Sequence, residues 1–338
     1  MSKGEYVFDV IQNQATAWAS LSSSVKPFQY AGPYIFIGSG TSFYLAQVAC
    51  AKALKNGIPA VALPTAEIIL DTEMWLNRQV TLIVISRSGT TSEAILAAKK
   101  AKDYHIPIIA VTCHHSTPLA NLANQVLVSD DGDEDTVVMI RSFTSMLVLL
   151  QSSIDMVANR SGCSPIMLAD AAHPILKQAN SLIPLLLRNI PRRVYVLGGG
   201  LRQGIAEEGV LKLQEMAGAV ALAFNPLEFR HGPWGSLENT DAVFLLGQRD
   251  RIEYEHPLYN DLLQRTRHIT VIACEDWFGG LEMDESSMLQ LPNNIPDEDA
   301  GPLAVLPLQI LAWHMACLAG ENPDAPKNLT PVVVLNHE

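Results

Sequence analysis

Thr81 to Thr91, with the sequence Thr-Leu-Ile-Val-Ile-Ser-Arg-Ser-Gly-Thr-Thr, give the clearest indication of the architecture. Leu82 to Ile85 form a short, apolar, mostly β-branched run, which predicts a parallel strand buried on both faces. An apolar helical face follows from Glu93 to Ala101, so we expect a helix to begin near Thr91. A strand that leads through a short turn into a helix is typical of α/β proteins with a parallel sheet.

The turn between this strand and helix carries hydroxyl groups and a glycine. Ser86, Ser88 and Thr91 would lie beside free backbone amides at a helix N-terminus, where the helix dipole favours an anion. We therefore expect an anion site here. An ordinary β-to-α turn with Thr91 as the N-cap residue explains the same residues and stays the alternative.

Composition limits the classes of partner. The 338 residues are 48% hydrophobic and 17% charged, with a formal net charge of -12. Because no basic run is available, nucleic acid and an anionic membrane are not expected as partners. The N-terminus has no apolar signal core, and no uninterrupted apolar run approaches membrane-spanning length. Five scattered cysteines form neither a CxxC pair nor a disulfide pattern, so we expect a cytoplasmic protein with reduced thiols.

Strands alternate with helices along most of the chain, which predicts parallel sheets covered on both faces. The expected segments are an N-terminal helix (1–30), a first α/β unit (31–160), a connecting helix (161–191), a second α/β unit (192–320) and an extended, proline-containing tail (321–338). Within the first unit, a long apolar helix is expected from about Val137 to Val157.

Two stretches recur at nearly the same offset. Tyr34 to Gly40 is echoed by Val194 to Gly200, and Ile108 to Cys113 is echoed by Ile269 to Cys274. Because both the position and the context of the matches are preserved, the sequence predicts two duplicated α/β units.

The glycine-rich turns in these repeats do not fit a dinucleotide site. Phe43 and Gln203 stand where the GxGxxG pattern needs its third glycine, and no P-loop lysine follows either turn. A turn with hydroxyl groups is better suited to a compact phosphate and to sugar hydroxyls. We expect Ser39, Thr41 and Ser42 to join the Ser86 turn at the carboxyl edge of one sheet.

A charged stripe lies on a predicted helix that begins near Arg202. Glu208, Lys212 and Glu215 are spaced i, i+4, i+7 and share one face. A solvated salt-bridge stripe is the simpler interpretation. The following loop favours a functional one, because His231, between Phe-Arg and Gly-Pro, belongs to neither a core nor a helix surface. A glutamate base with a histidine acid is what proton transfer beside a carbonyl needs.

Four motifs together resemble the sugar isomerase (SIS) domain family: Ser86 to Thr91, Arg141 to Thr144, Glu208 to Glu215, and Phe229 to Pro233. Within it, the chain resembles the branch of tagatose-6-phosphate ketose/aldose isomerases and amino-sugar-phosphate deaminases, and is similar to the isomerase half of glucosamine–fructose-6-phosphate aminotransferase. The resemblance implies two tandem αβα sandwiches, flavodoxin-like or Rossmann-like, each with a five-stranded parallel sheet. It also implies a homodimer with composite active sites.

The resemblance assigns roles residue by residue. The base falls on Glu215, the ring-opening acid on His231, and a supporting pair on Glu208 and Lys212. The substrate-binding positions are Ser39, Gly40, Thr41, Ser42, Ser86, Arg87, Ser88, Thr91, Val137 and, in the tail, Thr330. The expected ligand is a hexose or hexosamine 6-phosphate. No metal or other cofactor is expected, because His114 and His115 have no ligand-spaced partner beyond Cys113.

Two departures from the aminotransferase pattern shape the expected reaction. Pro331 stands where the resemblance places a Schiff-base lysine, and no N-terminal cysteine glutaminase domain is found in this sequence. We therefore expect deamination of an amino-sugar phosphate, deglycation of fructosamine 6-phosphate, or aldose–ketose exchange, rather than transfer of an amide nitrogen. A non-catalytic phosphosugar sensor is the alternative, although a sensor would not need both Glu215 and His231.

Overall fold

The computed structural model describes residues 3–76 and 79–330. The chain divides into two compact units, which are described separately. The first unit comprises Asn13–Met167 and described residues 328–330, and the second comprises described residues 3–12 and Leu168–Lys327. Two helices, α1 (Glu5–Ser20) and α8 (Pro165–Leu186), contribute residues to both units.

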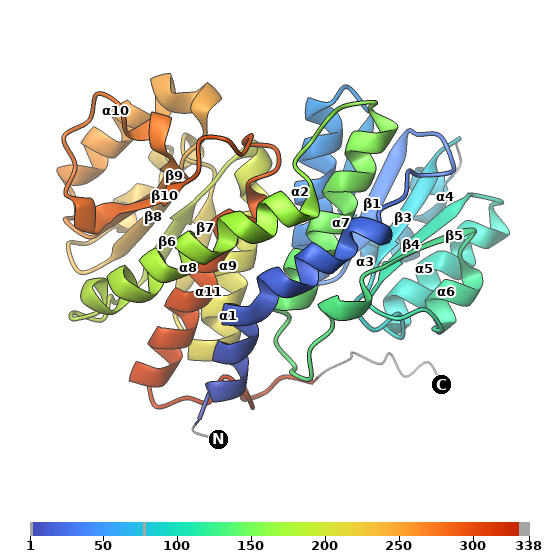
Figure 1. The fold of residues 1–338 in the computed structure, drawn as a ribbon, viewed down its shortest axis with the longest axis horizontal. Helices are drawn as coiled ribbons and strands as arrows, with labels where there is room; N and C mark the ends of the chain where they lie inside the picture. The colour runs from blue at the N-terminus through green and yellow to red at the C-terminus, as the bar shows by residue number, and fades with distance from the viewer. Residues whose placement is uncertain (1–2, 77–78, 331–338) are drawn as a thin grey trace. The chain divides into compact units, whose positions relative to one another are not determined.

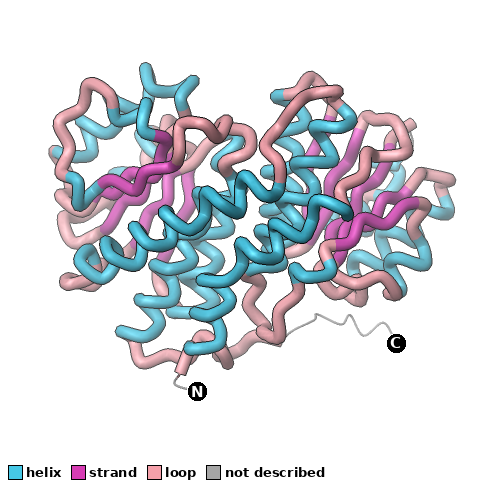
Figure 2. Tube along the Cα trace, viewed as in Figure 1, coloured by secondary structure: helices cyan, strands magenta, loops and turns pink. Residues whose placement is uncertain are grey.

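The first unit is built on a five-stranded parallel sheet in the order β2-β1-β3-β4-β5. Its strands are β1 (Tyr34–Gly38), β2 (Ala60–Pro64), β3 (Thr81–Ile85), β4 (Ile108–Thr112) and β5 (Gln125–Val128). Its other helices are α2 (Thr41–Lys55), α3 (Thr65–Leu70), α4 (Thr72–Leu76), α5 (Ser92–Asp103), α6 (Pro118–Leu122) and α7 (Arg141–Val157). Figures 1 and 2 show the strands side by side with helices along them.

Alternate residues of each strand enter different layers, as the pleat requires. Ile35 and Ile37 of β1 belong to a cluster with the apolar faces of α3, α5 and α6, whereas Phe36 is buried on the other face. Helix α2 packs along β1 and β2 and also against α7. Both faces of the sheet are therefore covered, which accounts for the continuous apolar sequence of β3.

The second unit repeats this plan with a sheet in the order β10-β9-β8-β6-β7. Its strands are β6 (Val194–Leu197), β7 (Ala221–Phe224), β8 (Ala242–Leu246), β9 (Ile269–Cys274) and β10 (Met288–Leu291), all parallel. Helix α10 (Ile252–Leu263) contributes to a core cluster on one face, whereas α9 (Gln203–Ala217) packs along β6 and β7 and against α11 (Gly301–Leu318).

The duplication predicted from the sequence is confirmed by the strand orders. Counted from its β7 edge, the second sheet runs β7-β6-β8-β9-β10, which matches β2-β1-β3-β4-β5 strand for strand. The two repeated stretches therefore occupy equivalent strands, β1 with β6 and β4 with β9. The fold prediction of two α/β units with five-stranded parallel sheets is confirmed.

Two expectations need correction. Helix α7 begins at Arg141 rather than near Val137, because residues 133–140 form a non-helical segment held by side-chain contacts described below. Helix α11 is long and apolar enough to cross a membrane by length and composition, contrary to the expectation that no such run exists. Of that helix, 78% is buried inside the protein, so its apolar surface is core surface.

Candidate active site

The predicted phosphate turn joins the end of β3 to the start of α5. Ser86 is buried, and its Oγ accepts a hydrogen bond from the Gly89 N–H at 3.2 Å. The hydroxyl of Thr91 lies 3.2 Å from Ser86 Oγ and makes no capping bond to α5, although Thr91 is the N-cap residue. Thr91 therefore does not cap α5 through its side chain, and the anion site at this turn stays a prediction.

Gly89 is required by the shape of this turn. Its φ is +62°, and a Cβ atom built there would lie 2.3 Å from Thr117 Oγ1. Its carbonyl accepts a hydrogen bond from Leu119 N at 3.1 Å, and the hydroxyl of Thr117 caps α6 through Ala120 N at 3.0 Å. The turn is thereby fixed against the start of α6, which gives the hydroxyl groups a defined position.

The second predicted turn follows β1, the strand beside β3. Thr41 and Ser42 are buried at the start of α2, whereas Ser39 and Gly40 are exposed. A Cβ on Gly38 would lie 2.3 Å from the Ser42 carbonyl carbon, so only glycine lets the helix start this close to the strand. Since β1 and β3 are neighbours and parallel, both turns lie at one edge of the first sheet, as predicted.

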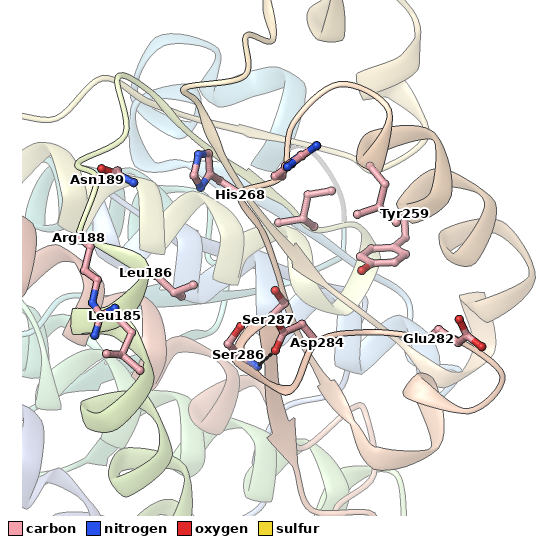
Figure 3. Close-up of a pocket in the computed structure, with 13 residues that line it drawn as sticks. Leu185, Leu186, Arg188, Asn189, Tyr259, His268, Glu282, Asp284, Ser286 and Ser287 are labelled. Atoms are coloured by element: carbon pink, nitrogen blue, oxygen red, sulfur yellow. Dashed lines mark hydrogen bonds between the residues drawn. The ribbon is translucent and has the colours of Figure 1, made fainter.

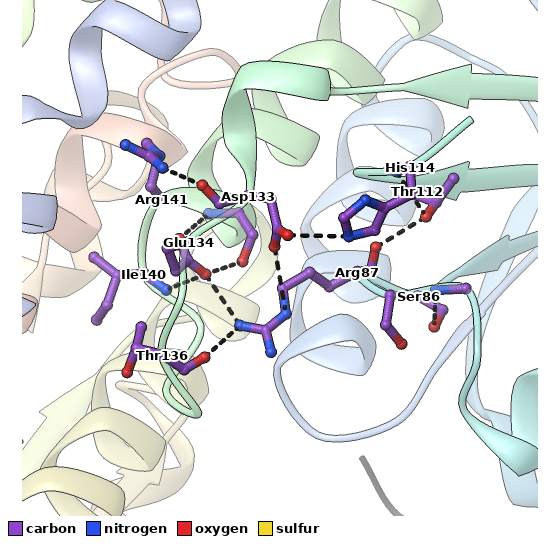
Figure 4. Close-up of polar contacts among 12 residues, drawn as sticks. Ser86, Arg87, Thr112, His114, Asp133, Glu134, Thr136, Ile140 and Arg141 are labelled. Carbon is purple, nitrogen blue, oxygen red and sulfur yellow. Dashed lines mark hydrogen bonds and ion pairs between the residues drawn. The ribbon is translucent and has the colours of Figure 1, made fainter. Parts of the chain in front are cut away.

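Arg87, one of the predicted substrate-binding residues, is held by the segment before α7 (Figure 4). Its Nη1 donates to the Thr136 carbonyl at 2.8 Å and lies 3.4 Å from Glu134 Oε1. Its Nε lies 3.8 Å from Asp133 Oδ1. The predicted role of Arg87 on substrate stays a prediction, but the contacts show that its guanidinium ties the phosphate turn to residues 133–136.

Glu134 is the centre of this network and was not singled out by the sequence. It is buried, and its carboxylate accepts hydrogen bonds from the N–H and hydroxyl of Ser142 and from the Ile140 N–H. Burial raises the pKa of Glu134, while the bonds from Ser142 and the charge of Arg87 act in the opposite direction. The network holds residues 133–140 out of the helix, and this segment includes Val137.

In the second unit, the charged stripe of α9 is buried and not solvated. Lys212 Nζ lies 2.5 Å from Glu215 Oε2 and 3.3 Å from Glu208 Oε1. The side chains of Lys212 and Glu208 are 0% exposed, whereas that of Glu215 is 18% exposed. The solvated-stripe interpretation is therefore wrong. Of the two carboxylates, Glu215 is the one that reaches solvent.

His231 lies in an exposed loop that has a buried anchor. Phe229 is fully buried against Tyr195 and Phe224, and the His231 N–H donates to the Glu228 carbonyl at 2.9 Å. Gly232 has a φ of +125°, which only glycine adopts without strain, so the chain turns sharply after His231. His231 is thus exposed to solvent, on a loop that is anchored by the buried side chain of Phe229.

The remaining predicted residue of the tail, Thr330, is exposed, and Pro331 lies outside the described residues. The predicted catalytic residues and the predicted phosphate turn belong to different units of the chain. A cavity of about 470 Å³ opens elsewhere, at the edge of the second sheet where β9 and β10 begin (Figure 3). His268, Asp284 and Ser286 line it, and it contains none of the predicted site residues.

Comparison with known proteins assigns both α/β units to one domain family. The sequence profile of the SIS domain matches the chain twice, over residues 31–156 and 186–319. Glutamine–fructose-6-phosphate aminotransferase (isomerizing) of Pyrococcus horikoshii is 28% identical over 89% of this chain and 51% of its own length. The D-galactosamine-6-phosphate deaminase of Shewanella sp. (strain ANA-3) is 27% identical over 86% of this chain and 77% of its own length. The chain spans about half the length of the aminotransferases it matches.

Solved structures share the fold across almost the whole chain. Glucosamine-6-phosphate deaminase from Thermotoga maritima superposes with a TM-score of 0.82 at 24% identity, covering 98% of this chain and 99% of that one. Tagatose-6-phosphate ketose/aldose isomerase from Escherichia coli superposes with a TM-score of 0.83 at 20% identity, covering 99% and 97%. At these identities the likeness establishes the architecture.

Proposed function

Because the chain belongs to the SIS domain family, we propose that it is an enzyme that moves a proton between C1 and C2 of a hexose or hexosamine 6-phosphate. Where the sugar carries an amino group at the reacting carbon, that group is released as ammonia. The related aminotransferases and the galactosamine-6-phosphate deaminase support a phosphosugar substrate.

The buried Glu208–Lys212–Glu215 cluster is the observation that carries this proposal. An ammonium fixed between two carboxylates in a desolvated helix face holds each carboxylate in one orientation by charge-assisted contacts. Only Glu215 combines such a contact with access to solvent. A carboxylate that is oriented and reachable is what a general base needs.

The chemistry is the same for the isomerase and the deaminase reaction. Glu215 takes the proton from C2 of the open-chain aldose and returns it to C1. With a hydroxyl at C2, the product is the ketose. With an amino group at C2, the product is a C2 iminium, which one water molecule hydrolyses to the ketose and ammonia. No separate amine from the protein is needed in either case, which agrees with Pro331 at the position of the family's lysine.

His231 and the phosphate turn supply the other two requirements. An imidazole protonates the ring oxygen and opens the cyclic sugar near neutral pH. The hydroxyls of Ser86, Ser88 and Thr91 and the N-terminus of α5 hold the phosphate, which keeps the open chain from diffusing away. The proposal includes a homodimer in which one subunit lends His231 to its partner's site, as the resemblance implies.

A substrate panel tests the proposal. Hexose and hexosamine 6-phosphates are incubated with the protein, and ammonia and ketose are measured separately. Glu215→Gln should lower kcat by roughly 10²- to 10⁴-fold with little change in KM. Glu207→Gln is the matched control, since Glu207 precedes the buried cluster on α9 and pairs with Gln203 instead. Normal turnover in Glu215→Gln would refute its role, and binding of every sugar phosphate without either product would identify a sensor.

A further inference from the structure

The carboxyl edge of the second sheet is the topological counterpart of the predicted phosphate site. In the first sheet, the turns after β1 and β3 carry the predicted phosphate ligands. In the second, the equivalent turns follow β6 and β8 and contain Gly198–Gly199–Gly200 and Gln248–Arg249–Asp250–Arg251. The serine and threonine residues of the first edge are thus replaced by glycines and an arginine-rich turn.

The side chain of Arg251 lies directly over the glycine turn. A Cβ on Gly200 would lie 2.1 Å from Arg251 Nη2, and one on Gly199 would lie 2.6 Å from Arg251 Nη1 and 2.7 Å from Asn225 Nδ2. Three N–H donor groups therefore converge on a backbone that has no side chains of its own. Within residues 3–76 and 79–330, no hydrogen bond from Arg251 Nη1 or Nη2 is found, and its ion-pair contact is to Asp250 at 4.0 Å.

Two buried side chains at the same edge, Gln248 and Glu255, each have one oxygen without a hydrogen-bond partner among the described residues. Gln248 and Glu255 are each 1% exposed. The Nε2 of Gln248 donates to the Gly199 carbonyl at 2.8 Å, and Oε2 of Glu255 accepts from the Gln248 N–H and from Trp277 Nε1. The amide oxygen of Gln248 and the second carboxylate oxygen of Glu255, Oε1, accept no hydrogen bond from any described residue. A buried polar atom left unpaired costs free energy, so each calls for a partner from outside the chain.

Arg251, Asn225 and Glu255 border one cavity of about 230 Å³, and Gln248 lies behind its wall, hydrogen-bonded through its N–H to Glu255. Its wall includes Arg251, Glu255 and Asn225, the exposed ring of Tyr254, and apolar surface from Pro226 and Leu227. Asp250 also lines it and adds a negative charge at the rim. None of the predicted catalytic or substrate-binding residues contributes to the wall. The N-termini of α9 and α10, which follow the two turns, add favourable dipoles for an anion.

We propose that this cavity, the Arg251 cavity, is a second ligand site that binds a small polyhydroxylated anion, either a phosphorylated sugar or a sugar acid. The guanidinium of Arg251 and the amide of Asn225 would hold the acid group. A sugar hydroxyl would donate to the unpaired Oε1 of Glu255, and the sugar ring would pack on Tyr254. A purely apolar ligand would leave that oxygen unpaired, and a bare anion would make no contact with it or with the ring of Tyr254.

The Arg251 cavity also borders the catalytic loop. Asn225 Oδ1 accepts a hydrogen bond from the Leu227 N–H at 3.0 Å, and this turn begins the segment that leads to His231. A ligand that engages the amide of Asn225 therefore contacts the base of the loop on which His231 is presented.

Binding measurements test the site without relying on turnover. The probes are 1,5-anhydroglucitol 6-phosphate, which is cyclic and cannot open, together with glucuronate and inorganic phosphate. Affinity and stoichiometry are measured by isothermal titration calorimetry in the wild type and in Arg251→Gln, Gly199→Ala and Arg192→Gln. Gly199→Ala places a Cβ against Arg251 Nη1 and Asn225 Nδ2, and so displaces the proposed ligand donors without removing charge, at a residue whose φ of −133° suits alanine. Arg192→Gln removes the same charge from an exposed residue before β6.

We expect Arg251→Gln and Gly199→Ala to weaken binding at one site per chain by at least tenfold, with Arg192→Gln unchanged. Binding of the sugar phosphate alone assigns a phosphorylated sugar, and binding of glucuronate alone assigns a sugar acid. The proposal is overturned if no probe binds in a way that depends on Arg251, if Arg192→Gln weakens binding equally, or if inorganic phosphate binds as tightly as both sugars. Repeating the titration in Ser88→Ala/Thr91→Ala separates this site from the predicted phosphate turn.

Discussion

At the scale of single residues, the hydroxyl groups after β3 depart from the usual pattern of helix capping. A threonine at an N-cap position ordinarily accepts a hydrogen bond from the helix backbone. Thr91 does not, and its hydroxyl lies against that of Ser86. The first turn of α5 therefore keeps N–H donors that a capping side chain would have used, and these donors suit a phosphate.

We predict that Ser88→Ala/Thr91→Ala raises KM for a 6-phosphate sugar while leaving the fold intact. Hydrogen bonds to a charged group contribute about 1.5–3 kcal/mol each, so KM should rise by roughly tenfold or more per hydroxyl lost. Steady-state kinetics with the phosphorylated sugar and its unphosphorylated counterpart measure the effect. The loss should be confined to the phosphorylated substrate, and an equal loss on both would place the phosphate elsewhere.

A second residue-scale prediction concerns Gly89. Gly89→Ala should destabilise the protein by about 1–3 kcal/mol, because the residue has a φ of +62° and its Cβ would clash with Thr117. Gly57→Ala is the matched control, since Gly57 has a φ of +76° with nothing within 4 Å of its Cβ. The free energy of unfolding of both variants is measured with urea. The loss in Gly57→Ala gives the cost of alanine at a positive φ, and the additional loss in Gly89→Ala gives the cost of the clash with Thr117. Equal destabilisation would show that the contact with Thr117 is readily relieved.

At the scale of elements, helix α9 combines a core position with a charged face. Helix α11 covers one side of α9 with apolar residues, and Gly209 allows Leu308 to approach, since a Cβ there would lie 2.4 Å from Leu308 Cδ1. Burial lowers the pKa of Lys212, but the carboxylates of Glu208 and Glu215 outweigh it and place that pKa above its ordinary value of 10.5. The lysine is therefore charged inside the protein.

Lys212→Met should destabilise the protein by about 3–5 kcal/mol, because it leaves a buried carboxylate without its counter-charge. Glu208→Gln/Lys212→Met should recover part of that loss, and urea unfolding at pH 8 measures both. Since the pKa of Lys212 is raised on folding, its stabilising contribution is complete below pH 10.5 and is lost as the pH rises through the folded value. The difference between wild type and Lys212→Met should accordingly be constant from pH 7 to 9 and shrink above pH 10.5. A difference already shrinking at pH 8 would contradict a charged Lys212.

At the scale of the whole molecule, duplication has produced two sheets of identical strand order with different carboxyl edges. The first edge has serines and threonines beside glycines, whereas the second has arginine and buried amide and carboxylate groups. The same backbone plan thus provides two positions where a ligand is expected in open α/β folds. The predicted catalytic residues lie in the second unit, and the predicted phosphate turn lies in the first.

The proposed dimer leads to a prediction about mixed subunits. Glu215→Gln and His231→Ala should each be nearly inactive as pure proteins. After the two are unfolded and refolded together, part of the activity should return, because some mixed dimers carry one site with both residues intact. Activity per heterodimer is the measurement, with each variant refolded alone as the control. No recovery in a sample that contains heterodimers would mean that each subunit completes its own site.

Much of the architecture was predictable because it depends on short-range patterns. The apolar, mostly β-branched run at Leu82 to Ile85 predicted a buried strand, and the repeated glycine turns marked equivalent positions in two units. The burial of Lys212 was not predictable, because a Glu-Lys-Glu stripe has the same spacing on a solvated helix as on one covered by α11. Nor was the delayed start of α7, since an apolar helical pattern does not reveal that Arg87 and Glu134 hold the preceding residues.

By itself, the sequence determined the parallel α/β units, their duplication, the hydroxyl-lined turn and the charged stripe, because strand burial, turn chemistry and helical spacing are properties of neighbouring residues. The tertiary structure decided which distant groups meet. It placed Arg87 against Glu134 and the guanidinium of Arg251 over Gly199 and Gly200, and it buried the ammonium of Lys212. These contacts follow from the order of strands in each sheet and the packing of helices on it, which no local pattern specifies.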